Sequence, residues 1–173
     1  MSEGQPPYPI LWLAGEVHDR GREAVLEQLG PYVLVGETTE DEPQGWAFAT
    51  SAMVSPEIAQ RVGLGFDFER GVVIPLVKRT TTFPNVILIG RSSSNDVRID
   101  DPSVSKLHAR VRLIRGGFDL EDAGSRNGTW VDEKEIQTGI AVGRGDRIRF
   151  GQRAFMVHDS VELVGLLERI GPP

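Results

Sequence analysis

The sequence predicts a mainly β protein, namely a β-sandwich with a small α/β extension at its N-terminus and a helix at its C-terminus. Three observations lead to this prediction. From about residue 71 onward, short apolar runs alternate with turn-rich stretches without long helical patterns between them, which favours a sandwich or barrel over a doubly wound sheet. The first part of the chain mixes helix-like and strand-like runs, and residues 159–173 change to a helical period.

Residues 1–65 are expected to form the α/β extension, whose role the sequence does not reveal. A helix is predicted over residues 22–29, where Gly30 and Pro31 end it. Strands are predicted at 32–35 and 46–49, and a short helix at 55–62 with Pro56 in its first turn. The apolar side chains of this part would form a large adhesive surface if exposed. We therefore expect the extension to be ordered and packed on the sandwich.

Residues 66–158 are expected to form the sandwich. Its strands are predicted at residues 72–77, 86–89, 107–114, 118–121, 129–131, 147–150 and 154–157. The alternation over 107–114 places two sets of side chains on opposite faces: Leu107, Ala109, Val111 and Leu113 on one, and His108, Arg110 and Arg112 on the other.

Residues 159–173 are expected to form an amphipathic helix that packs on the sandwich. Asp159 and Glu162 have the spacing of a capping box. An apolar stripe follows at helical spacing, and Gly171 with two prolines ends the pattern.

The composition excludes several classes of function. The net charge is −6 and the pI about 5.1, which argues against nucleic-acid binding, since this needs a broad basic face. The apolar runs are too short to span a membrane. Cysteine is absent, which fits the cytoplasm and leaves no thiolate metal site or cysteine nucleophile. The three histidines lack metal-ligand spacing, so no metal or cofactor is expected.

Four short motifs lie in register within the β pattern: Gly90-Arg91-Ser92, Asn95-Asp96, Ser105-Lys106-Leu107-His108 and Ser125-Arg126-Asn127-Gly128-Thr129. In this order and spacing they resemble the forkhead-associated (FHA) domain, a β-sandwich that binds phosphothreonine peptides. The resemblance covers residues 66–158 and implies an FHA-type sandwich. A phosphothreonine carries nearly two negative charges, and its binding requires a fixed guanidinium, hydroxyl donors and backbone N–H groups on neighbouring loops.

The resemblance implies roles for individual residues. Arg91 and Ser105 are expected to contact the phosphate, Lys106 or Arg126 to add positive charge, and Asn127 to hydrogen-bond the peptide backbone. Gly90, His108 and Gly128 are expected to be structural. Some members of the family have a basic phosphate-contacting residue two positions before the serine, where this chain has Ser103.

The residues also allow other interpretations. Arg91 could form a surface ion pair with Asp96 or Asp101, while Lys106 and Arg126 could be solvated charges. An FHA-like scaffold could also bind partners independently of phosphate. An enzyme with its site in the N-terminal part is the third hypothesis, but the sequence shows no nucleophile elbow or paired acidic motif.

The resemblance favours a non-catalytic adaptor that binds a phosphorylated protein or a Ser/Thr kinase. Thr38 and Thr39 lie in an acidic segment after Glu37. This arrangement resembles small FHA proteins in which such a threonine is phosphorylated and folds back into the same protein's pocket. Thr38 and Thr39 are therefore candidate phospho-acceptors.

Overall fold

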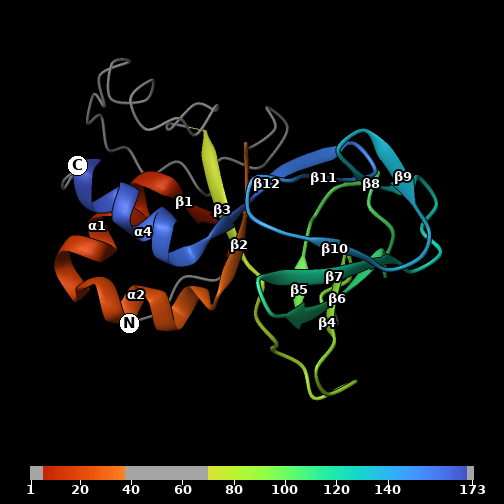
Figure 1. The fold of residues 1–173 in the computed structure, drawn as a ribbon, viewed down its shortest axis with the longest axis horizontal. Helices are drawn as coiled ribbons and strands as arrows, with labels where there is room; N and C mark the ends of the chain where they lie inside the picture. Colours follow the sequence, from red (N-terminus) through yellow and green to blue (C-terminus); the bar gives the residue numbers. More distant parts are fainter. Residues whose placement is uncertain (1–5, 38–69, 171–173) are drawn as a thin grey trace. The chain divides into compact units, whose positions relative to one another are not determined.

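The computed structural model describes residues 6–37 and 70–170, and within these the chain divides into two compact units. The first unit combines residues up to Pro75 with those from Asp159 onward, and the second runs from Leu76 to His158. In Figure 1 the helices belong to the first unit, and most of the strands belong to the second.

Within residues 6–37, 70–75 and 159–170, the first unit joins three helices to three strands. The helices are α1 (Ile10–Arg20), α2 (Arg22–Leu29) and α4 (Ser160–Ile170), and the strands are β1 (Tyr8–Pro9), β2 (Tyr32–Glu37) and β3 (Gly71–Pro75). The strands are antiparallel neighbours in the order β1-β3-β2.

Helix α4 packs against α1 and α2. Helix α1 was not predicted from the sequence. Its Ile10, Leu13, Ala14 and Val17 recur at helical spacing and are buried. Their stripe shares one core with the buried apolar residues of α4: Leu163, Val164 and Leu167.

Asp159 caps α4, in line with the sequence pattern. Its Oδ1 accepts hydrogen bonds from the backbone N–H groups of Val161 and Glu162, at 2.9 and 3.2 Å. These donors have no partner within a helix, so the carboxylate satisfies two groups that the helix leaves open.

Several expectations fall outside the described residues. They are the strand at 46–49, the helix at 55–62 and the candidate phospho-acceptors Thr38 and Thr39. Of the remaining extension, the helix at 22–29 and the strand from Tyr32 are present.

The second unit contains two groups of paired strands. One has the order β12-β11-β8-β9, formed by Arg153–Asp159, Arg147–Phe150, Thr129–Val131 and Lys134–Ile136. The other has the order β10-β7-β6-β4-β5, formed by Ile140–Val142, Gly117–Asp122, Ala109–Ile114, Ile87–Gly90 and Val97–Arg98. Pairing is antiparallel except between β4 and β5.

The second unit buries apolar side chains from both groups of strands. These include Ile89, Val111, Phe118 and Leu120 from one group, and Ile148, Phe150, Phe155 and Val157 from the other. The mainly β architecture predicted from the sequence is therefore confirmed. Strands β5, β9 and β10 were not predicted.

The order of β4 and β6 in their sheet positions the candidate site. Ile89 near the end of β4 pairs with Ala109 at the start of β6. The loops that follow Gly90 and precede Ala109 therefore leave the sheet at the same end. Across residues 6–37 and 70–170, the helices are too short or too polar to cross a bilayer.

Candidate functional site

Arg91 directly follows β4 and is fixed to the loop that precedes β6. Its backbone N–H donates to the Ser105 carbonyl at 2.9 Å. Its side-chain Nε donates to the Val104 carbonyl at 3.2 Å. Among the residues the structure describes, the two terminal nitrogens of Arg91 have no hydrogen bond or ion pair. The guanidinium is thus held at its base, and its outer edge is available to a ligand.

The acidic residues considered as partners of Arg91 are engaged elsewhere. Asp96 pairs with Lys78 Nζ at 2.8 Å, and Asp101 lies 3.8 Å from Arg153 Nη1. The surface ion pair that competed with ligand binding in the sequence analysis is therefore not formed.

Gly90 allows the two loops to approach each other. A Cβ atom at this position would overlap the Lys106 carbonyl and crowd the Asn95 side chain. The Asn95 amide donates to the same carbonyl at 2.6 Å and to the Ser92 carbonyl at 2.9 Å. A side chain at position 90 would thus separate the Arg91 loop from the Ser105 loop.

Ser105 connects the Arg91 loop to the loop before β8. Its Oγ accepts a hydrogen bond from the Arg126 backbone N–H at 2.9 Å. Its own N–H donates to His108 Nδ1 at 3.0 Å. The Ser105 hydroxyl proton remains free to donate to an anionic oxygen, since the oxygen is the acceptor in the contact with Arg126.

His108 is a buried structural residue. Because Nδ1 accepts from Ser105 N–H, the neutral ring carries its proton on Nε2, which lies 3.0 Å from the Gly128 carbonyl and donates to it. The ring also meets Phe150 edge-on, with centroids 5.6 Å apart. Burial lowers the pKa of His108 against the opposing effect of the Gly128 carbonyl, which favours the neutral ring.

The alternation predicted around His108 is wrong at its start. Leu107 was expected on the same face as Ala109, but it is exposed, whereas His108 is completely buried. The regular strand begins only at Ala109, so period-two alternation does not apply to the two residues before it. Leu113, expected to share the face of Ala109 and Val111, is also exposed.

Asn127 and Ser103 form the next contact in the cluster. Asn127 Nδ2 donates to the Ser103 carbonyl at 2.8 Å. The Ser103 hydroxyl donates to Asp101 Oδ1 at 2.6 Å and accepts from the Gln152 N–H at 2.9 Å. The Ser103 hydroxyl is therefore used in internal contacts.

Gly128 adopts a backbone conformation suited to glycine. Its φ is +79°, and a Cβ atom there would meet the Glu135 carboxylate and the Trp130 ring nitrogen. Its carbonyl accepts from both His108 Nε2 and Gly151 N–H. The loop that presents Asn127 is thereby fixed on two sides.

Lys106 and Arg126 are exposed, and within the described part of the chain their side chains form no ion pair. Lys106 follows Ser105 in the chain, and the backbone N–H of Arg126 donates a hydrogen bond to the Ser105 hydroxyl oxygen. The structure therefore brings Arg91, Ser105, Arg126 and Asn127 into one hydrogen-bonded set of loops. Lys106 adjoins this set by sequence, without a side-chain contact to it.

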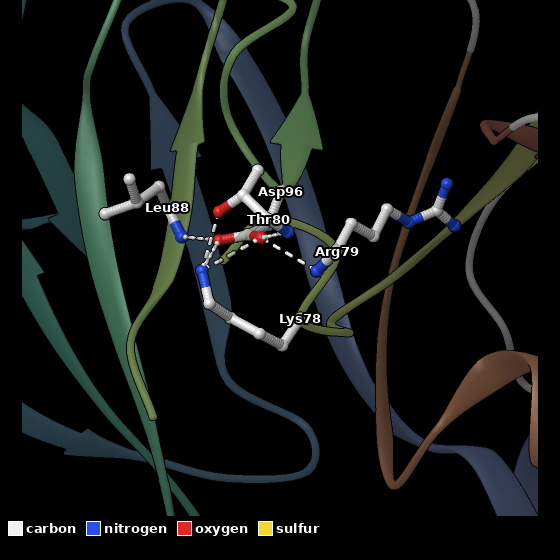
Figure 2. A network of polar contacts seen from close by, with 5 residues as sticks. All are labelled: Lys78, Arg79, Thr80, Leu88 and Asp96. Atoms are coloured by element: carbon white, nitrogen blue, oxygen red, sulfur yellow. Dashed lines mark hydrogen bonds and ion pairs between the residues drawn. The ribbon is translucent and has the colours of Figure 1, made fainter. Parts of the chain in front are cut away.

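Asp96, in the loop that begins at Arg91, holds residues 78–80 and β4 through hydrogen bonds to its carboxylate (Figure 2). Its completely buried carboxylate accepts from Lys78 Nζ and from the N–H groups of Arg79, Thr80 and Leu88, at distances between 2.6 and 3.1 Å. Burial by itself would raise the pKa of Asp96, but these hydrogen bonds lower it to about 2. Sequence reasoning named Asp96 as part of the Asn95-Asp96 motif and as a possible partner of Arg91, and did not predict these hydrogen bonds.

Asp122 has a similar role before the Asn127 loop. Its carboxylate accepts from the N–H groups of Gly124 and Ser125 and from the hydroxyls of Ser125 and Thr129. Burial opposes ionisation, yet these hydrogen bonds hold the pKa of Asp122 below its usual value. The sequence analysis did not identify Asp122 as a structural residue. Its position shortly before Gly124-Ser125 was the signal in the sequence, because aspartate often accepts hydrogen bonds from the backbone of such turns.

The chain is similar to known proteins over part of its length. Residues 87–151 match the family model of the FHA domain. The glycogen accumulation regulator GarA of Mycolicibacterium smegmatis is 36% identical over 63 residues, which is 36% of this chain and 39% of that protein. FhaB of Mycobacterium tuberculosis, an FHA domain-containing protein, is 33% identical over 76 residues, covering 44% of this chain and 49% of FhaB.

A third relative is the oxoglutarate dehydrogenase inhibitor of Corynebacterium glutamicum, 38% identical over 63 residues that cover 36% of this chain and 43% of the inhibitor. The chain thus spans less than half the length of each of these three relatives.

Two solved structures also align with the chain. The FHA domain of FhaA, complexed with the intracellular domain of Rv3910, is 28% identical, with 47% of this chain and 88% of that chain covered and a TM-score of 0.41. Mycobacterium tuberculosis EmbR in complex with a low-affinity phosphopeptide is 20% identical, with 83% and 30% covered and a TM-score of 0.46.

Proposed function

We propose that this chain, whose residues 87–151 match the FHA domain family model, binds phosphothreonine-containing segments of partner proteins without catalysing a reaction. The proposed ligand contacts are Arg91 and Ser105 for the phosphate, Lys106 and Arg126 for additional charge, and Asn127 for the peptide backbone. The partner is a phosphorylated protein or a Ser/Thr kinase, and the absence of cysteine suits the cytoplasm as the place of action.

The observation that supports this function most directly is the state of Arg91. Its Nε is bonded to the Val104 carbonyl, so the planar guanidinium is oriented before a ligand arrives. The two outer nitrogens can then form paired hydrogen bonds to phosphate oxygens. Less side-chain entropy is lost on binding when the donor is already fixed.

The state of His108 supports a binding role over catalysis. A general base needs a free nitrogen within reach of a substrate proton. Both ring nitrogens of His108 are engaged within the protein, and the ring is buried. The histidine of the motif therefore supports the loops, consistent with a non-catalytic module.

The decisive experiment is binding of the full chain to an oriented phosphothreonine peptide library, with matched unphosphorylated peptides. We expect binding to depend on the phosphate, with weaker binding of the same peptides carrying phosphoserine. Equal binding of phosphorylated and unphosphorylated peptides would instead favour a phosphate-independent scaffold and overturn the proposal.

A further inference from the structure

The turn from Asp101 to Val104 contacts Arg91 and Asn127, which are proposed to bind the phosphate and the peptide backbone. The Ser103 carbonyl accepts from the Asn127 side-chain amide at 2.8 Å. The next carbonyl, that of Val104, accepts from Arg91 Nε at 3.2 Å. Two consecutive peptide groups therefore orient the two side chains, and the conformation of this turn sets where both point.

The Asp101 carboxylate holds the turn in this conformation. Its Oδ1 accepts from the Ser103 N–H at 2.8 Å and from the Ser103 hydroxyl at 2.6 Å. The Asp101 carbonyl accepts from the Val104 N–H at 3.0 Å. The carboxylate also lies 3.8 Å from Arg153 Nη1, and the two side chains are only 15% and 8% exposed. Asp101 thus holds the N–H and the hydroxyl of Ser103 with a carboxylate that is largely shielded from solvent.

The turn between β11 and β12 completes the enclosure of Ser103. The Gln152 N–H donates to the Ser103 hydroxyl at 2.9 Å. Gly151 approaches so closely that a Cβ atom there would overlap the Ser103 carbonyl. The Gly151 N–H donates to the Gly128 carbonyl at 3.0 Å. The same turn therefore contacts both Ser103 and the loop that carries Asn127.

From these contacts we infer that Ser103 is a positioning residue for the proposed peptide site. Its hydroxyl, held by Asp101 and Gln152, fixes the carbonyl that orients the Asn127 amide. With one amide hydrogen directed to Ser103, Asn127 retains its oxygen and its second N–H for an extended peptide. Ser103 then acts on the ligand through Asn127 rather than by touching the phosphate. This inference rests on the proposed function.

The first test measures phosphopeptide affinity. Ser103→Ala should weaken binding about tenfold, the equivalent of one lost hydrogen bond. Ser103→Thr, which keeps the hydroxyl, should restore most of the affinity. The control is Thr82→Ala, since Thr82 is exposed and precedes β4, at the opposite end of that strand from Gly90. It should bind like the wild type.

A double-mutant cycle separates positioning from general weakening. If Ser103 acts through Asn127, the effects of Ser103→Ala and Asn127→Ala overlap, and the double variant binds about as well as Asn127→Ala alone. Strictly additive losses would overturn the inference. Ser103→Cys, similar in volume but weak in hydrogen bonding, serves as a second variant if the alanine protein does not fold.

A second readout needs no peptide. In the free protein, the side-chain amide signals of Asn127 in a nitrogen–proton correlation spectrum should shift in Ser103→Ala and return in Ser103→Thr. If phosphopeptides fail to bind the wild type, the proposed function is wrong, while this spectrum still tests whether Ser103 orients Asn127. Unchanged Asn127 amide signals in Ser103→Ala would overturn the positioning role.

Discussion

At the scale of single residues, Arg91 has the most direct effect on the proposed binding. Arg91→Ala removes the fork of donors facing the phosphate, and a hydrogen bond to a charged group contributes roughly 1.5–3 kcal/mol. We expect phosphopeptide affinity to fall at least about tenfold, with little change in thermal stability because Arg91 is exposed. Arg91→Lys should also bind poorly, since an ammonium lacks both the Nε contact to Val104 and the fork.

Arg115→Ala is the matched control for Arg91. Arg115 is also exposed, but it follows β6 at the end of the sheet opposite Ala109. Isothermal titration of each variant with one phosphothreonine peptide compares the two positions directly. Unchanged affinity in Arg91→Ala, or equal losses in both variants, would contradict the assignment of the phosphate site.

The lowered pKa of Asp96 leads us to expect a specific dependence of the free energy of unfolding on pH. Its pKa in the folded protein is about 2, against an ordinary value of 3.8. A carboxyl with a lowered pKa stabilises the fold above its ordinary pKa and loses this contribution as the pH falls toward the folded value. We expect the advantage of wild type over Asp96→Asn to shrink by roughly 2 kcal/mol between about pH 5 and pH 2.

Urea unfolding at several pH values measures this difference. Asp100→Asn is the control, because the Asp100 side chain is 67% exposed and pairs with Arg98 at the surface. Its effect should be small and nearly independent of pH. A constant gap between wild type and Asp96→Asn over this range would mean that the Asp96 carboxylate is not held ionised by the contacts in Figure 2.

At the scale of elements, the sequence predicted best where local pattern and tertiary environment agree. Helix α2 and strand β11 occupy the predicted residues, since each combines a clear period with glycine at its end. Strand β9 was missed because its hairpin turn uses Asp132 and Glu133, both with positive φ. This turn lacks the Asn-Gly or Asp-Gly signal that identifies such hairpins.

The candidate site was also predicted only as far as local sequence pattern allows. Its motif residues could be found from their spacing, but the hydrogen bonds between them could not. The sequence analysis noted Ser103 because some FHA domains have a basic residue at that position, whereas the structure shows its hydroxyl bonded to Asp101 and Gln152. Gln152 lies far from Ser103 in sequence, so no local pattern could reveal this contact.

Helix α4 supports a prediction about packing. Leu163 is completely buried in the core of the first unit, whereas Val161 on the same helix is 54% exposed. Leu163→Ala should reduce the free energy of unfolding by about 2–5 kcal/mol, because it leaves a cavity. Val161→Ala should change it by less than about 0.5 kcal/mol. Chemical denaturation of both variants tests this, and similar effects at the two positions would contradict the described packing of α4.

At the scale of the whole molecule, the two units differ in how the chain builds them. The second unit is continuous from Leu76 to His158, whereas the first combines residues from both ends of the sequence. In the first unit, α1 and α4 contribute to one apolar core. Residues from both ends of the sequence therefore contribute to the same core.

This organisation predicts that the loss of α4 is felt mainly in the first unit. Ending the chain at Asp159 removes Leu163, Val164 and Leu167 from the core to which Leu13 and Val17 also belong. Amide hydrogen exchange should then become fast in α1, α2 and β2, while β4, β6 and β7 retain most of their protection. Ending the chain at residue 170 keeps α4 and serves as the control. Equal acceleration in all strands would indicate one cooperative fold, and unchanged exchange in α1 would mean that α4 does not complete this core.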